Sequence, residues 1–148
     1  PKLLILDEPT ANFDVEFRKD FLKLLQEFIA DGQKSVVLAT HLMEDIDRLA
    51  DYLIYMEDGR SIFAGQMEDF REQYRIVSGE AYKIKLLDRE DIIAMEQKKY
   101  GAKALVRHHG YQHYDTELTA VPPTVEEFMY FLSKTKTAER RNHEKVIH

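Results

Sequence analysis

The sequence contains no cysteine among its 148 residues, so it forms no disulfide and carries no thiolate chemistry. This absence suits a reducing compartment, and we expect a cytoplasmic protein. Its longest apolar runs, such as residues 3–6 and 36–39, fall far short of the roughly 20 residues that a membrane-spanning helix needs. We therefore expect any membrane component to be another chain. Pro1 precedes an apolar strand without the charge pattern of a signal peptide, so we expect the start to be an artificial cut.

The sequence also lacks an excess of positive charge. Its 27 acidic residues outnumber 21 basic ones, which gives a formal net charge of -6. Non-specific binding to nucleic acid needs a broad positive surface, so we expect no nucleic-acid partner. The hydrophobic share of 44% and the charged share of 32% are typical of a soluble, packed protein. The length suits one domain or two small ones.

A third absence concerns phosphate binding. A P-loop has the form GxxxxGK[ST] and requires glycine followed by lysine. None of the six glycines is followed by lysine. The chain therefore has no P-loop with which to hold a nucleotide on its own.

The first forty residues predict a strand, a helix and a second strand. Residues 3–7 form an apolar run that ends in carboxylates, a pattern typical of a strand buried on both faces of a parallel sheet. From Phe17 to Phe28 apolar residues recur at helical spacing. Residues 35–40 form a second apolar run. A parallel pair with a right-handed crossover is the expected arrangement.

The remaining sequence predicts a hairpin and then a second, smaller α+β domain. A polar run from residue 134 onward has too few apolar residues to offset its ordering entropy, so we expect a frayed or disordered tail. A capping-box pattern at Thr124 and Glu127 predicts the start of the last helix. The other expected elements are a helix over 42–50, a hairpin over 52–64, a linking helix over 67–74, a strand over 82–86, a helix over 89–100 and a strand over 104–106.

Two adjacent carboxylates, Asp7 and Glu8, follow the first predicted strand. Ligands of open α/β proteins bind beyond the carboxyl ends of such strands. Phosphoryl transfer to water needs a divalent cation and a base that orients the water, and neighbouring carboxylates can divide these tasks. The alternative is that both acids merely cap the following turn.

The order of three motifs resembles that of ABC ATPases. Residues 3–9, LLILDEP, resemble the family's Walker B strand and catalytic glutamate, and residues 11–14, ANFD, lie where the family has its D-loop. His41 ends the next apolar strand, where the family has its switch histidine. Phe13 departs from the smaller aliphatic residue usual in the D-loop.

The resemblance implies a role for each matching residue. Asp7 would hold Mg²⁺ through water, Glu8 would act on the attacking water, and His41 would contact the terminal phosphate of ATP. Asn12 and Asp14 would form the D-loop contact with a second nucleotide-binding domain. Two of these residues have ordinary alternatives, because His41 could be a surface residue and Asp14 could cap the helix that follows it.

The resemblance also implies an organisation for the chain. Residues 1–66 would be the C-terminal part of an ABC nucleotide-binding domain, a partial P-loop NTPase parallel sheet with flanking helices. Residues 67–74 would link it to an accessory α+β domain, 75–133, which resembles a region found in bacterial exporter ATPases, and 134–148 would be a polar tail. The family's signature sequence, Leu-Ser-Gly-Gly-Gln, is absent, so the chain carries half a site and should be inactive alone.

The implied function of the intact protein is ATP hydrolysis that powers transport, with export as the expected direction. Its cofactors would be ATP and Mg²⁺. Its partners would be a permease at the inner face of the membrane and a second nucleotide-binding domain, in a homodimer or heterodimer. Two alternatives stay open: a soluble ABC ATPase without a membrane partner, and a non-catalytic interaction fragment.

Overall fold

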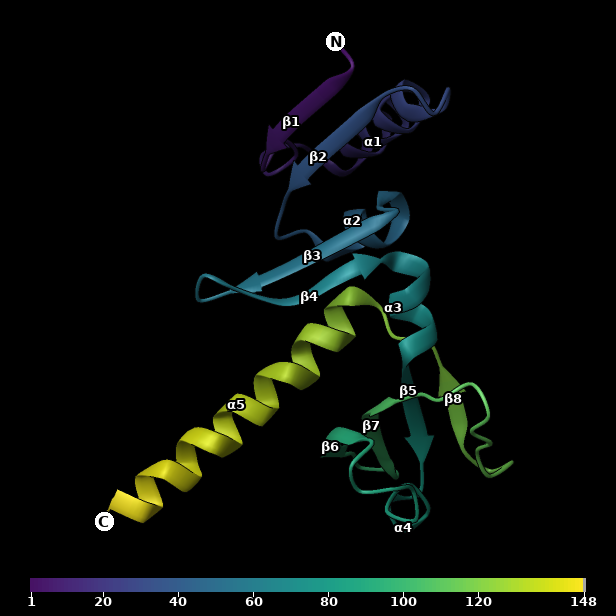
Figure 1. The fold of residues 1–148 in the computed structure, drawn as a ribbon, viewed down its shortest axis with the longest axis vertical. Coiled ribbons are helices and arrows are strands. Elements are labelled where there is room, and N and C mark those ends of the chain that lie inside the picture. Colours follow the sequence, from purple (N-terminus) through teal and green to yellow (C-terminus); the bar gives the residue numbers. More distant parts are fainter. Residues whose placement is uncertain (148) are drawn as a thin grey trace. The chain divides into compact units, whose positions relative to one another are not determined.

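The N-terminal fifty residues are built around a pair of parallel strands. The computed structural model describes residues 1–147, except the side chains of Arg140 and residues 144–147. β1 (Leu3–Asp7) pairs in parallel with β2 (Ser35–Ala39), and α1 (Val15–Ile29) connects them (Figure 1). The predicted α/β strand, helix and strand unit is confirmed.

The start of α1 is fixed by a capping side chain and an aromatic group. The carboxylate of Asp14 accepts a hydrogen bond from the backbone N–H of Phe17 at 2.9 Å, which satisfies one of the unpaired donors at the helix start. The ring of Phe13 packs edge-on against Phe17 and Phe21, with centroid separations of 4.7 and 5.5 Å. These contacts tie the loop after β1 to the first turns of α1.

The prediction that the strands are buried on both faces is wrong. Half-buried and exposed residues alternate along β1 and β2. Leu3, Ile5 and Val37 are each more than half exposed. The physical reason is that α1 packs on one side of a two-stranded sheet, and the described residues 1–50 provide no second layer.

A short helix, α2 (Met43–Leu49), follows β2 and agrees with the helix predicted there. The chain then divides into two compact units, residues 1–50 and 51–148. The second unit begins with the hairpin of β3 (Tyr52–Glu57) and β4 (Arg60–Gln66). Asp58 and Gly59 form its turn with φ angles of 49° and 73°, so the predicted hairpin is confirmed.

The hairpin groups with the C-terminal unit, although the sequence placed it before a boundary at residue 66. Phe63 of β4 packs edge-on against Phe70 and Phe128, with ring centroids 5.4 and 6.4 Å apart. These aromatic contacts explain why the hairpin belongs to the compact unit 51–148. The assignment of residues 1–66 to a nucleotide-binding domain stays a prediction.

The C-terminal unit is an antiparallel sheet with helices, as expected for an α+β domain. Besides the hairpin, it contains a four-stranded sheet of β5 (Tyr74–Gly79), β6 (Ile92–Gln97), β7 (Ala102–Arg107) and β8 (Thr119–Val121), in the spatial order β6, β7, β5, β8. Its largest fully buried side chains include Phe70, Ile84, Leu105 and Phe131. The helices of this unit are α3 (Met67–Gln73), α4 (Ala81–Ile84) and α5 (Val125–Ile147).

Two predicted elements of this unit are wrong. The strand expected over 82–86 is the short helix α4, because Ile84 is fully buried while Tyr82 and Leu86 are exposed, so the three residues do not share one face. The helix expected over 89–100 is replaced by β6, which pairs with β7. Gly101 has a φ of 91° in the turn between these strands. In residues 89–100, pairing between β6 and β7 outweighs the local pattern that predicted a helix.

The last helix is longer than expected. Thr124 and Glu127 form the predicted capping box, since each side chain accepts the other's backbone N–H, at 3.1 and 3.2 Å. α5 continues to Ile147, so the prediction of a frayed tail from residue 134 is wrong over the described residues; His148 lies outside them. Lys134 pairs with Glu96 at 3.3 Å, and Lys136 pairs with Glu57. These ion pairs anchor the first part of the polar segment.

Candidate functional site

Glu8 follows β1 in an uncommon backbone conformation. Its φ is 46°, in the left-handed region that costs a residue with a Cβ about 1 kcal/mol. Its backbone N–H donates to the carbonyl of Ala39 at 2.8 Å, which extends the parallel pairing one residue beyond the strand. Residues held in such conformations occur often at functional sites. This backbone turn directs the Glu8 side chain toward the end of β2.

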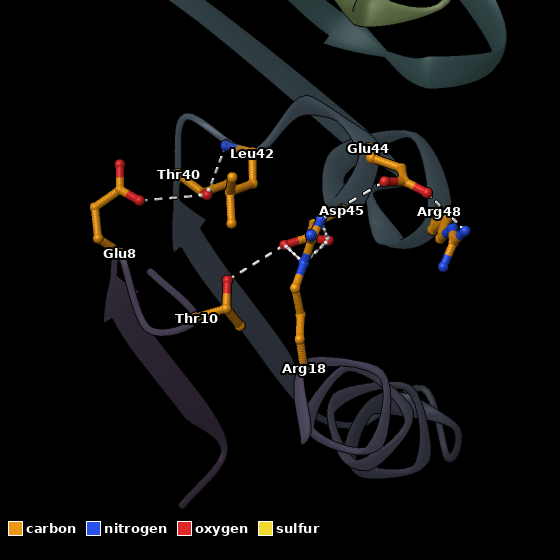
Figure 2. A network of polar contacts seen from close by, with 8 residues as sticks. All are labelled: Glu8, Thr10, Arg18, Thr40, Leu42, Glu44, Asp45 and Arg48. Atoms are coloured by element: carbon orange, nitrogen blue, oxygen red, sulfur yellow. Dashed lines mark hydrogen bonds and ion pairs between the residues drawn. The ribbon is translucent and has the colours of Figure 1, made fainter. Parts of the chain in front are cut away.

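The carboxylate of Glu8 is bound by the two residues that directly follow β2. One oxygen, Oε1, accepts the backbone N–H of His41 at 3.0 Å and lies 2.9 Å from the ring nitrogen Nδ1 of the same residue. The other oxygen, Oε2, accepts a longer bond of 3.4 Å from the hydroxyl of Thr40 (Figure 2). The Thr40 hydroxyl in turn accepts the N–H of Leu42 at 3.0 Å. Glu8 and His41, predicted from separate motifs, are therefore in direct contact.

This pair is accessible to water. The side chains of Glu8 and His41 are 39% and 68% exposed. A neutral imidazole that donates from Nδ1 to a carboxylate keeps Nε2 as an acceptor for another partner, and a protonated ring can donate from both nitrogens. The arrangement can hold a water molecule near a carboxylate and present an imidazole to a phosphate.

The other three predicted site residues lie close along the chain but outside this contact. Asp7 ends β1 opposite Ala39, and its side chain is exposed. Asn12 is exposed on the following loop. Asp14 caps α1, so its ordinary alternative role is realised. Because Asp14 is exposed, its carboxylate can cap α1 and also contact another protein chain.

No metal centre is formed by this chain's own side chains in the part that the structure describes: no group of three His, Cys, Asp or Glu residues is placed to hold an ion. The adjacent histidines of the C-terminal unit each have a separate polar partner. Nδ1 of His108 lies 2.9 Å from the Tyr114 hydroxyl, and Nε2 of His109 lies 3.0 Å from a carboxylate oxygen of Asp91.

A second polar cluster beside the pair was not predicted from the sequence. Asp45 of α2 is almost fully buried, and its carboxylate accepts from the Arg18 guanidinium at 2.5, 2.9 and 3.2 Å and from the Thr10 hydroxyl at 3.3 Å (Figure 2). The Asp45 hydrogen bond raises the pKa of Arg18 above its ordinary value. One signal could have found it. Asp45 lies at helical spacing between Leu42 and Leu49, on the apolar face of α2.

Comparisons with known proteins agree with the resemblance to ABC ATPases. No protein-family model matches the chain. The energy-coupling factor transporter ATP-binding protein EcfA2 of Streptococcus agalactiae is 29% identical over 130 residues, which is 87% of this chain and 40% of that protein. The protein of the same name from Lactococcus lactis is 44% identical over 69 residues, 47% of this chain and 24% of that protein. Over part of its length, the chain is a homologue of ABC transporter ATP-binding proteins.

The chain spans 40% or less of the length of these two ATP-binding proteins. A solved structure of a metal-chelate-type ABC transporter in an inward-facing conformation matches 74% of this chain and 41% of its own, with 19% identity and a TM-score of 0.44. Among the described helices, none is both long and apolar enough to cross a membrane.

Proposed function

We propose that the chain is the C-terminal part of the ATP-hydrolysing subunit of an ABC transporter. In this proposal Glu8 and His41 act at the terminal phosphate of ATP. The observation that carries it is the contact between the two residues, with the Glu8 carboxylate 3.0 Å from the backbone nitrogen and 2.9 Å from the ring nitrogen of His41. Their accessibility to water and the relatives' names support the same reaction.

The proposed chemistry is transfer of the terminal phosphoryl group to water. A water molecule attacks the phosphorus atom, the bond to the bridging oxygen of ADP breaks, and the water's proton passes to the Glu8 carboxylate. His41 holds that carboxylate through its backbone N–H and Nδ1, which leaves Nε2 for a phosphate oxygen. Asp7 would hold Mg²⁺ through water, and the ion would neutralise phosphate charge.

The missing parts of the site belong to other segments and partners. This chain has no GxxxxGK[ST] loop, so most phosphate contacts must come from elsewhere in the complete protein. Asn12 and Asp14, on the exposed loop before α1, would face a second nucleotide-binding domain of the same or another kind. The relatives are named as parts of energy-coupling factor transporters. We therefore propose a membrane partner of that type, at the cytoplasmic face, instead of the exporter permease expected from the sequence.

The test is a pair of substitutions in the full-length protein that contains this chain. Glu8→Gln keeps the shape of the side chain but removes the base, so kcat should fall by roughly 100- to 10,000-fold while ATP still binds. His41→Ala should also cause a large loss. Phosphate release gives kcat, and titration with MgATP gives affinity. The isolated 148-residue chain should neither bind nor hydrolyse ATP.

A matched control is Glu16→Gln, which removes an exposed carboxylate from the first turn of α1. This variant should hydrolyse ATP at the wild-type rate. Near-normal hydrolysis by Glu8→Gln would assign the base to another residue, and micromolar ATP binding by the isolated chain would contradict the argument from the absent P-loop.

A further inference from the structure

Asp45 joins the two segments that carry Glu8 and His41. It is 1% exposed, and Thr10, which donates to it, is 3% exposed. Thr10 lies two residues after Glu8, and Asp45 lies four residues after His41. A buried carboxylate is stable only when charged or polar partners satisfy it. Asp45 therefore fixes the separation of these segments just beyond the two candidate catalytic side chains.

Most of the strength of this junction comes from Arg18. The guanidinium of Arg18 reaches Asp45 from α1 through Nε, at 2.9 and 3.2 Å, and through Nη2, at 2.5 Å. Charge-assisted, bidentate pairs of this kind are stronger and more directional than neutral hydrogen bonds. The Thr10 hydroxyl is 3.3 Å from Asp45, longer than is usual for a hydroxyl donor. Arg18 therefore anchors the carboxylate, and Thr10 aligns the loop to it.

Glu8 and His41 need such support because packing does not hold them. Both side chains are exposed to water, where a pair of polar groups contributes little stability. Glu8 also has an unfavourable left-handed φ of 46°, which persists only if the surrounding chain enforces it. The nearest buried fixed points along the chain are Thr10 on one side and Asp45 on the other.

We propose that Asp45 is a positioning residue. Through Thr10 and Arg18, it holds residues 8–10 and residues 41–45 at the separation that ATP hydrolysis requires. This inference rests on the proposed function. It assigns to Thr10, Arg18 and Asp45 a role that acts through the positions of Glu8 and His41. Disturbing them should lower kcat and leave the KM for ATP nearly unchanged, because the phosphate-binding loop lies elsewhere.

The test compares Thr10→Val with Thr10→Ser in the full-length protein. Valine keeps the shape of threonine but removes the hydroxyl, whereas serine keeps the hydroxyl. Thr10→Val should lower kcat by roughly 10-fold or more, since a displacement of about 1 Å can cost an active site on the order of 100-fold in rate. Thr10→Ser should restore most of the rate. Melting temperatures of both variants should lie well above the assay temperature.

Further variants separate positioning from stability. Asp45→Asn should lower kcat in the same way, and the double variant with Thr10→Val should lose less than the product of the two single effects. Arg48→Gln removes an exposed pair with Glu44 on the same helix and should leave kcat unchanged. If Asp45→Asn does not fold, the two Thr10 variants decide the question.

The outcomes distinguish this inference from the proposed function. If Glu8→Gln is inactive but Thr10→Val hydrolyses ATP at the wild-type rate, or only melts earlier, the positioning role is wrong and the proposed function stands. If Glu8→Gln hydrolyses ATP normally, or the wild-type protein does not hydrolyse it, the proposed function fails and the inference fails with it.

Discussion

At the scale of single residues, Glu8 joins an unfavourable backbone conformation to a well-bonded side chain. Its φ is 46°, yet its carboxylate accepts bonds from Thr40 and from the backbone of His41. The side chain and the backbone therefore act in opposite directions on stability. Glutamate at this position is explained by what its carboxylate does, because glycine would suit the backbone better.

Two truncations of Glu8 should measure this backbone cost. Glu8→Gly and Glu8→Ala both remove the carboxylate, but only alanine keeps a Cβ in the left-handed region. The free energy of unfolding should be higher for Glu8→Gly by roughly 1 kcal/mol. Urea denaturation of the two variants measures the difference.

The same pair of substitutions at Lys23 provides the control. Lys23 is exposed in the middle of α1, where glycine destabilises a helix by about 0.5–1 kcal/mol relative to alanine. The order of the two variants should therefore reverse. If the alanine variant were the more stable one at Glu8 as well as at Lys23, Glu8 would carry no backbone strain.

At the scale of elements, the sequence predicted well wherever the pattern is local. The runs at β1 and β2, the Asp58–Gly59 turn and the capping box at Thr124 each carry their own signal. From the two parallel strands the contact between Glu8 and His41 could also be expected, because such strands end at one edge of a sheet.

The misassigned segment 81–97 and the unpredicted cluster around Asp45 have a common physical cause. The segment 81–97 was misassigned because pairing of β6 with β7 outweighs local spacing. The bonds of Asp45 to Arg18 and Thr10 span 27 and 35 residues, so the position of Asp45 on the apolar face of α2 indicates its burial but does not identify its partners. Contacts between distant segments set both features.

One acidic residue, Glu96, connects β6 to α5 through polar contacts. Glu96 of β6 accepts from the Tyr130 hydroxyl at 2.9 Å and pairs with Lys98 and Lys134 at 3.1 and 3.3 Å. The Tyr130 hydrogen bond, followed by the Lys98 bond, lowers the pKa of Glu96 from 4.5 to about 2. Because the folded pKa is depressed, its contribution to stability is present above pH 4.5 and is lost as the pH falls toward about 2.

We therefore expect Glu96→Gln to flatten the acid dependence of stability. Between pH 4.5 and pH 2, the melting temperature of the wild-type chain should fall more steeply than that of the variant. Circular dichroism at a series of pH values measures this. Glu139→Gln, at an exposed position on α5, should keep the wild-type slope, and equal slopes for all three proteins would remove the role of Glu96.

At the scale of the whole molecule, the boundary between the two units matters for any dissection of the chain. The compact unit 51–148 includes the hairpin. Phe63 of the hairpin packs on Phe70 and Phe128, and Glu57 pairs with Lys136 of α5. The sequence predicted a boundary at residue 66, which would separate these partners.

Two fragments should discriminate between the boundaries. The fragment 51–148 should unfold cooperatively, and 67–148 should melt at least several degrees lower, since a loss of 1 kcal/mol lowers the melting temperature of a domain this size by roughly 4–8 °C. Phe63→Ala in 51–148 should reproduce part of the decrease. Equal melting temperatures for the two fragments would instead support the boundary predicted from the sequence.

The parallel register of β1 and β2 also constrains which changes of length the chain can accept. Successive residues of a strand point to opposite faces, and Asp7 lies opposite Ala39. A single-residue insertion or deletion within β2 would turn His41 away from Glu8 and expose the apolar residues that face α1. The turn around Gly32, before β2, lies outside this pairing and can absorb such changes. Relatives that keep the Glu8–His41 contact should therefore vary in length before β2 and keep a constant length from its first residue to the histidine.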